Sequence, residues 1–253
     1  MKTGITQLSL IPVRASATDV SEQVTQLLFG EYFEIMQKQG TWLHIRSLRD
    51  NYEGWIDKRM AGEIFSETKN NKDELIIKDL ICKAHDENGN TMYIPCGGII
   101  SVPDKNKSFM LGNNKYTLNG PVNDVDKNIE ASAKRFLNAP YLWGGKTVFG
   151  IDCSGFVQIV FRTQGIELPR DATQQVKEGE TICFRHDAVA GDVAFFEDNN
   201  GKIIHTGIIL DEQHIIHASG CVRIDVLDHS GIYNADIKRY SHNLSVIKRF
   251  IKH

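Results

Sequence analysis

Apolar and polar positions change their rhythm along the chain at residue 122. Up to that point, short segments rich in β-branched and aromatic residues alternate with turn residues, which predicts strands. In the first such region, spanning residues 9–62, we expect strands at 26–28, 32–37, 42–46 and 54–56. Their spacing suits a small barrel of about five strands.

A second region of the same style covers residues 74–119. Strands are predicted at 75–82, 92–95, 98–102, 109–111 and 116–118, with a turn at 86–90. The polar run 66–73 reads as a linker between the two regions. We therefore expect one barrel domain at 1–65 and a second at 66–121.

Residues 122–253 change to a helix-then-sheet pattern. Helical periodicity runs over 124–137, and an amphipathic helix over 156–162 ends at Gly165. Strands follow at 192–196, 203–210, 215–218, 222–226 and 244–250. This order predicts an α+β domain with the papain-type order of elements, in which a helix precedes the sheet.

Composition narrows the class of protein. Of the 253 residues, 41% are hydrophobic, which is adequate for globular cores, and the net charge of −3 gives no electrostatic case for binding nucleic acid or an anionic membrane surface. We find no apolar run of membrane-spanning length and no signal-peptide pattern at the N-terminus. Five cysteines without a Cys-x-x-Cys pair favour a reducing, cytoplasmic setting.

The most informative run is Gly-Ile-Asp-Cys-Ser-Gly-Phe at 150–156, which places Cys153 where a loop becomes a helix. Unpaired amides and the helix dipole at such a position are expected to stabilise a thiolate and lower the pKa of the thiol. The amide of the nucleophile itself can donate to an oxyanion. The alternative for Cys153 is a buried cysteine with a purely structural role.

Two histidines on predicted strands offer a base and its orienting partner. His205 and His217 lie 12 positions apart, a separation that allows a hairpin with the two rings on adjacent strands. Gly207 is expected to leave room beside His205 for another helix or for substrate. The competitor His214 is predicted at the exposed turn, and a satisfied core histidine is the alternative for His205.

A metal site built from histidines and cysteines is the rival chemistry. His214 and His217, with His205 and either Cys183 or Cys153, supply suitable ligand types. No His-Glu-x-x-His spacing accompanies them, so we expect neither metal nor cofactor.

With these residues in hand, the third region resembles the NlpC-type cell-wall peptidases, which are papain-like. The resemblance spans residues 125–251 and rests on the blocks at 141–145, 150–157, 168–171, 191–196, 205–208 and 217–219. The two front regions resemble bacterial Src-homology-3-type barrels. The whole arrangement is similar to the cytoplasmic γ-D-glutamyl-L-diamino acid endopeptidases that recycle murein peptides.

The resemblance implies a cut between the γ-carboxyl of D-glutamate and the diamino acid of a small murein peptide, with Cys153 as nucleophile, His205 as base and His217 as its orienter. Around them it implies residues that bind substrate: Tyr141 beside the oxyanion, Trp143, Asp152 and Ser154 along the groove, and Asp171, Glu31 and Tyr52 at the free amine of L-alanine. Ala172 stands where a serine is common in the recycling group.

Each binding residue also has a plainer interpretation. Tyr141 and Trp143 can be core aromatics, and Asp152 can simply cap the cysteine helix. Asp171 can end a turn, whereas Glu31 and Tyr52 can lie in surface turns of their barrel.

Four functions remain open from the sequence. The first is the recycling peptidase, and the second is a hydrolase acting on the intact wall. The others are an inert binding module and a papain-like acyltransferase or amidase acting on another amide, since a fold alone does not fix the reaction.

Overall fold

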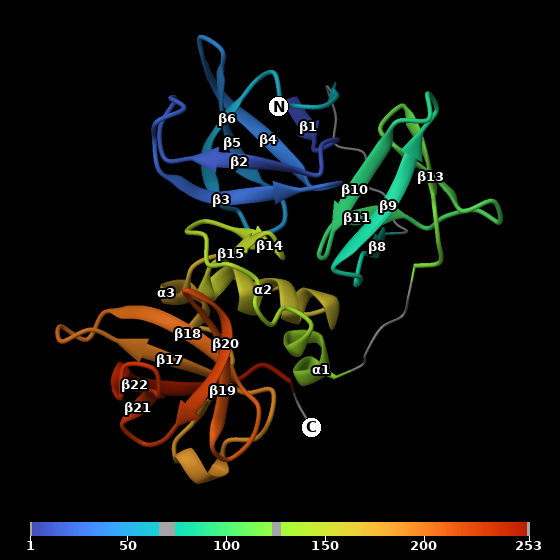
Figure 1. Ribbon diagram of the computed structural model, residues 1–253. Coiled ribbons are helices and arrows are strands. Elements are labelled where there is room, and N and C mark those ends of the chain that lie inside the picture. Colours follow the sequence, from blue (N-terminus) through green and yellow to red (C-terminus); the bar gives the residue numbers. More distant parts are fainter. Residues whose placement is uncertain (1, 66–73, 123–127, 252–253) are drawn as a thin grey trace. The chain divides into compact units, whose positions relative to one another are not determined.

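The computed structural model describes residues 2–65, 74–122 and 128–251, and it falls into two compact units, Met1–Val125 and Asp126–His253 (Figure 1). The predicted linker 66–73 lies outside the described residues. The two units are described separately below.

A seven-stranded antiparallel sheet forms the first part of unit 1, in the order β3-β2-β6-β5-β4-β1-β7. Alternating apolar side chains of its strands close a core that includes Ile11, Phe33 and Ile45. The four predicted strands are confirmed, and three others, at 2–5, 10–14 and 64–65, were missed. The strands are β1 (Lys2–Ile5), β2 (Leu10–Arg14), β3 (Gln23–Leu28), β4 (Tyr32–Gln39), β5 (Trp42–Ser47), β6 (Glu53–Asp57) and β7 (Ile64–Phe65).

The second part of unit 1 pairs four strands as β10-β9-β13-β12 and two as β11-β8. Its side chains share one core with the first part, because Ile5 and Phe29 pack in the same cluster as Ile94 and Phe109. The strands are β8 (Glu74–Ile76), β9 (Ile81–Asp86), β10 (Thr91–Pro95), β11 (Ile99–Ser101), β12 (Ser108–Leu111) and β13 (Asn114–Leu118).

The single strand predicted over 75–82 is wrong. The chain turns between β8 and β9, and the two strands join different sheets. Two backbone hydrogen bonds join Ile77, just after β8, to the segment before β11: Ile77 N–H donates to Gly98 O, and Gly97 N–H donates to Ile77 O, each at 2.8 Å. Lys78 and Asp79 interrupt the strand-forming residues here, and tertiary pairing assigns the two halves to different sheets.

The helices of unit 2 come before its large sheet, as predicted, although the short helix over Ala172–Gln175 and the short strands over 146–147 and 150–151 were not predicted. The elements are α1 (Ile129–Lys134), β14 (Lys146–Thr147), β15 (Gly150–Ile151), α2 (Cys153–Thr163), α3 (Ala172–Gln175), β16 (Glu180–Ile182), the 3-10 turn η1 (Arg185–Asp187), β17 (Val193–Glu197), β18 (Ile203–Ile209), β19 (His214–Ser219), β20 (Cys221–Leu227), β21 (Gly231–Asn234) and β22 (Arg239–Arg249). The helix predicted over 124–137 is shorter, since α1 ends at Lys134, and residues 123–127 lie outside the described part.

The sheet of unit 2 runs β16-β22-β17-β18-β19-β20-β21, and β21 also pairs with β22. This second pairing closes β17 to β22 into a ring. The ring encloses an apolar core that includes Phe196, Ile209, Ile215 and Leu227. Across the described chain strands outnumber helices, so the α+β label fits the whole protein only loosely.

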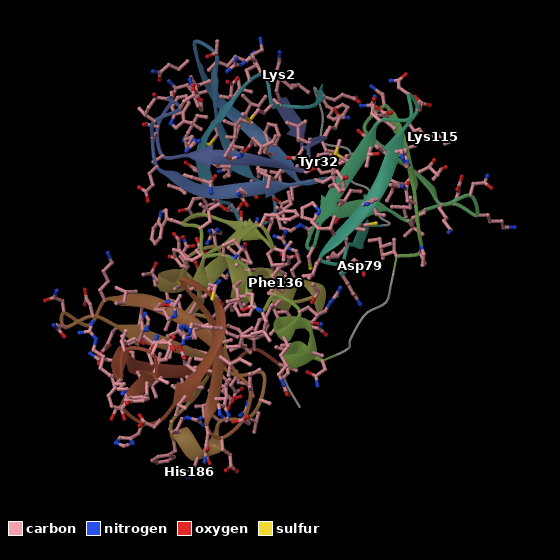
Figure 2. All side chains as sticks on the ribbon, viewed as in Figure 1. Lys2, Tyr32, Asp79, Lys115, Phe136 and His186 are labelled. Carbon is pink, nitrogen blue, oxygen red and sulfur yellow. The ribbon has the colours of Figure 1, made fainter. Side chains whose placement is uncertain are left out.

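Helix α2 is the element that carries the site. Asp152 caps its N-terminus, and Gly165, at φ 78°, follows its end. Every residue of α2 is buried, and the helix packs against β18. On its far side Phe136, labelled in Figure 2, meets Phe156 edge to face with ring centroids 5.8 Å apart. No helix of the described residues is long and apolar enough to cross a membrane.

Candidate active site

Cys153 is the first residue of α2, and its exposed fraction is 6%. The residue before it, Asp152, has extended backbone and accepts a hydrogen bond from Gly155 N–H at 2.7 Å. A Cβ at position 155 would lie 2.4 Å from Gly145 O, so the Cys-Ser-Gly order lets the preceding loop press against the helix start. The sequence thus fixes the cysteine at the loop–helix junction, as predicted.

The predicted fall in the pKa of Cys153 is wrong. Burial raises the pKa of Cys153 to about 12, and the negative charge of Asp152 acts in the same direction. The backbone N–H groups of Thr206 and Ser154 and the Arg170 guanidinium pull the pKa down, but burial outweighs them. The resting nucleophile is therefore a thiol, and it needs a base to become a thiolate. The contact with the Thr206 N–H places the sulfur of Cys153 beside β18, and Thr206 directly follows His205 in the chain.

The two predicted histidines meet on neighbouring strands. Gly207 of β18 pairs with His217 of β19, so His205 lies diagonally across from His217 on the same face of the sheet. His205 Nε2 lies 2.8 Å from His217 Nδ1, and both rings are buried. The predicted hairpin is confirmed.

The structural reason for a glycine at position 207 differs from the one predicted. A Cβ there would lie 2.8 Å from His217 Cβ and 2.9 Å from Ile215 Cδ1. The space beside His205 is thus filled by the neighbouring strand, and neither a further helix nor a substrate is needed to explain the glycine.

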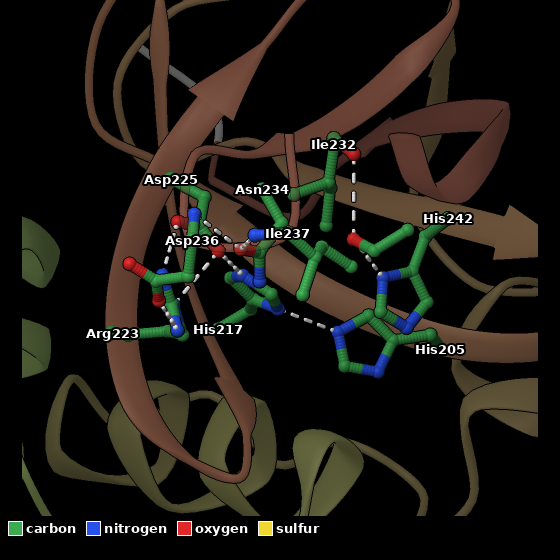
Figure 3. A network of polar contacts seen from close by, with 10 residues as sticks. His205, His217, Arg223, Asp225, Ile232, Asn234, Asp236, Ile237 and His242 are labelled. Atoms are coloured by element: carbon green, nitrogen blue, oxygen red, sulfur yellow. Dashed lines mark hydrogen bonds and ion pairs between the residues drawn. The ribbon is translucent and has the colours of Figure 1, made fainter. Parts of the chain in front are cut away.

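A carboxylate that was not predicted from the sequence extends the contact between His205 and His217 into a row of three side chains. Asp225 of β20 lies with its Oδ2 3.1 Å from His217 Nε2, and its exposed fraction is 6% (Figure 3). Arg223 contacts both oxygens of this carboxylate at 2.9 Å, and Arg223 Nη1 lies 2.8 Å from Asp236 Oδ2. Burial opposes ionisation of Asp225, but hydrogen bonds from His217 and Arg223 prevail and lower its pKa.

His242 of β22 covers the other face of His205. The two rings stack with centroids 4.0 Å apart and an angle of 21° between their planes. Burial lowers the pKa of His205 well below its usual value, and the neighbouring His217 and His242 act in the same direction. Burial likewise lowers the pKa of His242 to about 4. At neutral pH both rings are therefore uncharged, and His205 is free to accept a proton.

Asp152 and Ser154 belong to a buried ion-pair network. Arg170 binds both oxygens of Asp152, at 2.5 and 3.0 Å, and donates to Ser154 Oγ at 2.9 Å. Gly144 N–H also donates to Asp152 at 2.8 Å. The plainer interpretation of Asp152 as a helix cap is confirmed. This network ties the loop before the cysteine to the loop before α3.

Tyr141 and Trp143 lie in the loop that leads to Cys153. Trp143 is 58% exposed, so its interpretation as a core aromatic is wrong. Tyr141 is held by a hydrogen bond from its N–H to Gly220 O at 2.9 Å. Burial raises the pKa of Tyr141 to about 12, with Cys153 the next contributor, so its hydroxyl is protonated and close to the thiol.

The three residues expected at the substrate amine lie in both units. Asp171, half-buried, is the residue before α3, and Ala172 is the first residue of that helix. Glu31 and Tyr52 lie in unit 1. Glu31 is buried and accepts a hydrogen bond from Leu28 N–H at 2.8 Å, so it is no surface-turn residue. Tyr52 is half-buried, with its N–H donating to Asp50 Oδ1 at 3.2 Å.

The rival metal site does not assemble. Within residues 2–65, 74–122 and 128–251, no group of three or more histidine, cysteine or acidic side chains could hold a metal ion. His214, the expected competitor, pairs with Asp211 at 2.9 Å and is partly exposed. All five cysteines are free thiols, and Cys183 is exposed.

Comparison with known families agrees with this geometry. Residues 138–240, which contain Cys153, His205 and His217, match the NlpC/P60 family, and residues 13–59 match the bacterial dipeptidyl-peptidase Sh3 domain. The chain thus carries an NlpC/P60 domain with an SH3-type domain before it, and this match supports a cysteine peptidase. The second predicted barrel lies outside the SH3 match and stays a prediction.

Two curated relatives are similar over most of the chain. The γ-D-glutamyl-L-lysine dipeptidyl-peptidase of Bacillus subtilis (strain 168) is 28% identical over 221 residues, 77% of this chain and 71% of that protein. The protein of the same name from Bacillus cereus (strain ATCC 10987) is 25% identical, over 79% of this chain and 68% of its own. The crystal structure of an NlpC/P60 family protein from Bacillus cereus ATCC 10987 has the same fold over 100% of both chains, with a TM-score of 0.79 at 17% identity.

Proposed function

We propose that this protein is a cysteine peptidase that cuts the bond between the γ-carboxyl of D-glutamate and the diamino acid of small murein peptides with a free N-terminal L-alanine. The observation that carries the proposal is the buried row Asp225, His217 and His205, together with the contact of Cys153 at the start of α2 with the N–H of Thr206, the residue after His205. The names of the two Bacillus relatives support the bond and the dipeptide product.

In the first step, the sulfur of Cys153 attacks the scissile carbonyl carbon while His205 takes the thiol proton. A neutral thiol beside a neutral imidazole is the starting state, so charge develops only as the bond forms. The carbonyl oxygen becomes an oxyanion, and the Cys153 N–H in the first turn of α2 is placed to donate to it. The protonated hydroxyl of Tyr141 is a second donor at this position.

In the second step, the tetrahedral intermediate expels the amine of the diamino acid. His205 returns its proton to that leaving nitrogen, and the acyl group stays on Cys153 as a thioester. Water, deprotonated by His205, then attacks the thioester and releases L-Ala-γ-D-Glu and the free thiol.

We propose that a free amine on L-alanine selects the substrate, with Asp171 as the carboxylate of unit 2 that pairs with it. Because Asp171 is half-buried, leaving its carboxylate without the ammonium costs less than for a fully buried pair, on the order of 1–3 kcal/mol, which is about five- to a hundred-and-fifty-fold in specificity. N-acetylation of L-Ala-γ-D-Glu-L-Lys should therefore lower kcat/KM by about that factor, measured by mass analysis of the products.

A matched variant separates charge from shape in this test. Asp171→Asn should lose most of the preference for the free amine and cut both peptides slowly. Equal rates on the free and acetylated peptides by the unmodified enzyme would contradict amine selection. Kinetics of Glu31→Gln and Tyr52→Phe on the same two peptides test whether either residue takes part.

The wall-hydrolase alternative is tested with purified sacculi. The recycling proposal expects no dipeptide from stems still linked to muramic acid, whereas efficient digestion would favour the alternative. A parallel assay with L-Lys and diaminopimelate at the third position decides which diamino acid is preferred. We infer a reducing, cytoplasmic compartment, because the five cysteines, including the exposed Cys183, are free thiols.

A further inference from the structure

We propose that Asp225, held by Arg223, is a positioning residue that fixes the proton of His217 and so leaves His205 with a basic nitrogen for Cys153. As an effect on catalysis this inference rests on the proposed function. As a statement about protons it concerns the histidines alone. The set of Cys153, His205 and His217 alone does not include such a residue.

The side-chain contacts form one continuous row across β20, β19 and β18, and the start of α2 meets β18 at Thr206. Asp225 Oδ2 lies 3.1 Å from His217 Nε2, and His217 Nδ1 lies 2.8 Å from His205 Nε2. The planes of the His205 and His217 rings are nearly perpendicular, at 85°. Figure 3 marks the contact between the two rings with a dashed line. Thr206, the residue after His205, contacts Cys153 through its backbone N–H.

The direction of each hydrogen bond follows from the carboxylate. An ionised carboxylate only accepts, so His217 must donate from Nε2. Neutral His217 then has its lone pair on Nδ1 and accepts from His205 Nε2–H. His205 is left with its lone pair on Nδ1, the nitrogen that can take a proton from the thiol. Without the carboxylate, His217 can instead carry its proton on its own Nδ1 and donate it to His205 Nε2. His205 then carries its proton on Nδ1, which is the unproductive tautomer.

Arg223 keeps the carboxylate ionised and oriented. Its guanidinium contacts both oxygens of Asp225 at 2.9 Å, while Nη1 reaches Asp236 at 2.8 Å. Arg223 lies opposite His217 in the register of β19 and β20, and Asp225 lies opposite Ile215, two positions along the same face. The side chain of Asp236 is 71% exposed, so this end of the network opens to solvent.

The third ring, His242, has its own hydrogen bond and does not compete for the row. Ser241 Oγ donates to Ile232 O at 3.3 Å and lies 2.9 Å from His242 Nδ1, so His242 Nδ1–H donates to Ser241. The titratable and charged groups that face the pair of histidines are then Cys153, His242, Asp225 and Arg223. Of these, Asp225 supplies the negative charge that favours a cation on the row once His205 has taken a proton.

The test is Asp225→Asn, assayed for kcat/KM on free L-Ala-γ-D-Glu-L-Lys across pH. Since an amide can present either an oxygen or an NH₂ group to His217, we expect a loss of about a hundred- to ten-thousand-fold. Removing the negative charge also makes an imidazolium at His205 less stable, which lowers the pKa of His205. The acidic limb of the profile should therefore move to lower pH.

Asp192→Asn is the matched control. Asp192 is also a buried aspartate of unit 2 paired with an arginine, since Arg249 contacts both of its oxygens at 2.8 and 2.7 Å. It should lower the melting temperature at least as much as Asp225→Asn but leave the position of the acidic limb unchanged. If both variants lose activity in proportion to stability, with no shift in the pH profile, Asp225 is merely structural.

A second measurement needs neither substrate nor a variant that folds. Nitrogen-15 NMR of the histidine rings in the unmodified protein should find both His217 and His205 protonated at Nε2 at neutral pH. Protonation of His217 at Nδ1 would overturn the proposal. Because this readout is independent of the reaction, the inference can fail while the peptidase assignment stands, and the reverse also holds.

Discussion

Cys153→Ala is expected to lower kcat/KM on L-Ala-γ-D-Glu-L-Lys by about a million-fold, to the level left by binding alone. The reason is chemical: no other thiol lies at the start of α2, and without the sulfur His205 has no proton to take. Product formation measured by mass spectrometry over a range of enzyme concentrations provides the value.

The fold should survive this change, because alanine removes one sulfur atom and keeps the capping by Asp152. Circular dichroism and thermal melting of the variant check this expectation. Cys183→Ala is the matched control, since it removes an exposed thiol and should leave activity unchanged. Activity of Cys153→Ala within tenfold of the unmodified enzyme would rule out Cys153 as the nucleophile.

The second large effect is expected for His205→Ala, with a loss of about ten-thousand-fold or more, against a smaller loss for His217→Ala. The pKa of Cys153 is about 12, so the thiolate is scarce at neutral pH unless a base takes its proton. His205 is that base, whereas His217 orients and supports it. Steady-state rates of the two variants at pH 7 give the comparison.

His214→Ala is the control for this pair, because the side chain of His214 is partly exposed and its ring pairs with Asp211, away from the row of His205 and His217. Its activity should remain within about twofold, as is usual for a surface substitution. A loss for His214→Ala as large as that for His205→Ala would show that the base has been assigned to the wrong histidine.

Local features of the sequence predicted the parts of the site that depend on local structure. Asp152 and Gly155 around Cys153 allow the tight loop and cap the helix, and Gly165 ends it. The 12-residue separation of His205 and His217, with apolar neighbours in alternation, was enough to predict adjacent strands. These features depend on few long-range contacts.

Features that depend on strand register or on the burial of side chains could not be predicted from the sequence. Asp225 is found only once β19 and β20 are paired, although the alternation of Arg223 and Asp225 after the turn at Gly220 was a signal that both share a face. The pKa of Cys153 was predicted in the wrong direction because a helix start argues for a thiolate, whereas the surrounding sheet buries the sulfur. Gly207 was likewise misread, since its neighbours come from another strand.

The most direct test of the account uses a substrate-shaped electrophile, because a buried thiol with a raised pKa is a poor target for a generic alkylating reagent. L-Ala-γ-D-Glu with a diazomethyl ketone in place of the scissile amide puts the reactive carbon where the carbonyl would lie. Peptide mapping by mass spectrometry after incubation should find one label per chain, on Cys153, and should find none when the alanine nitrogen is acetylated. Labelling of any other cysteine, or equal labelling by the acetylated compound, would contradict the proposed peptidase.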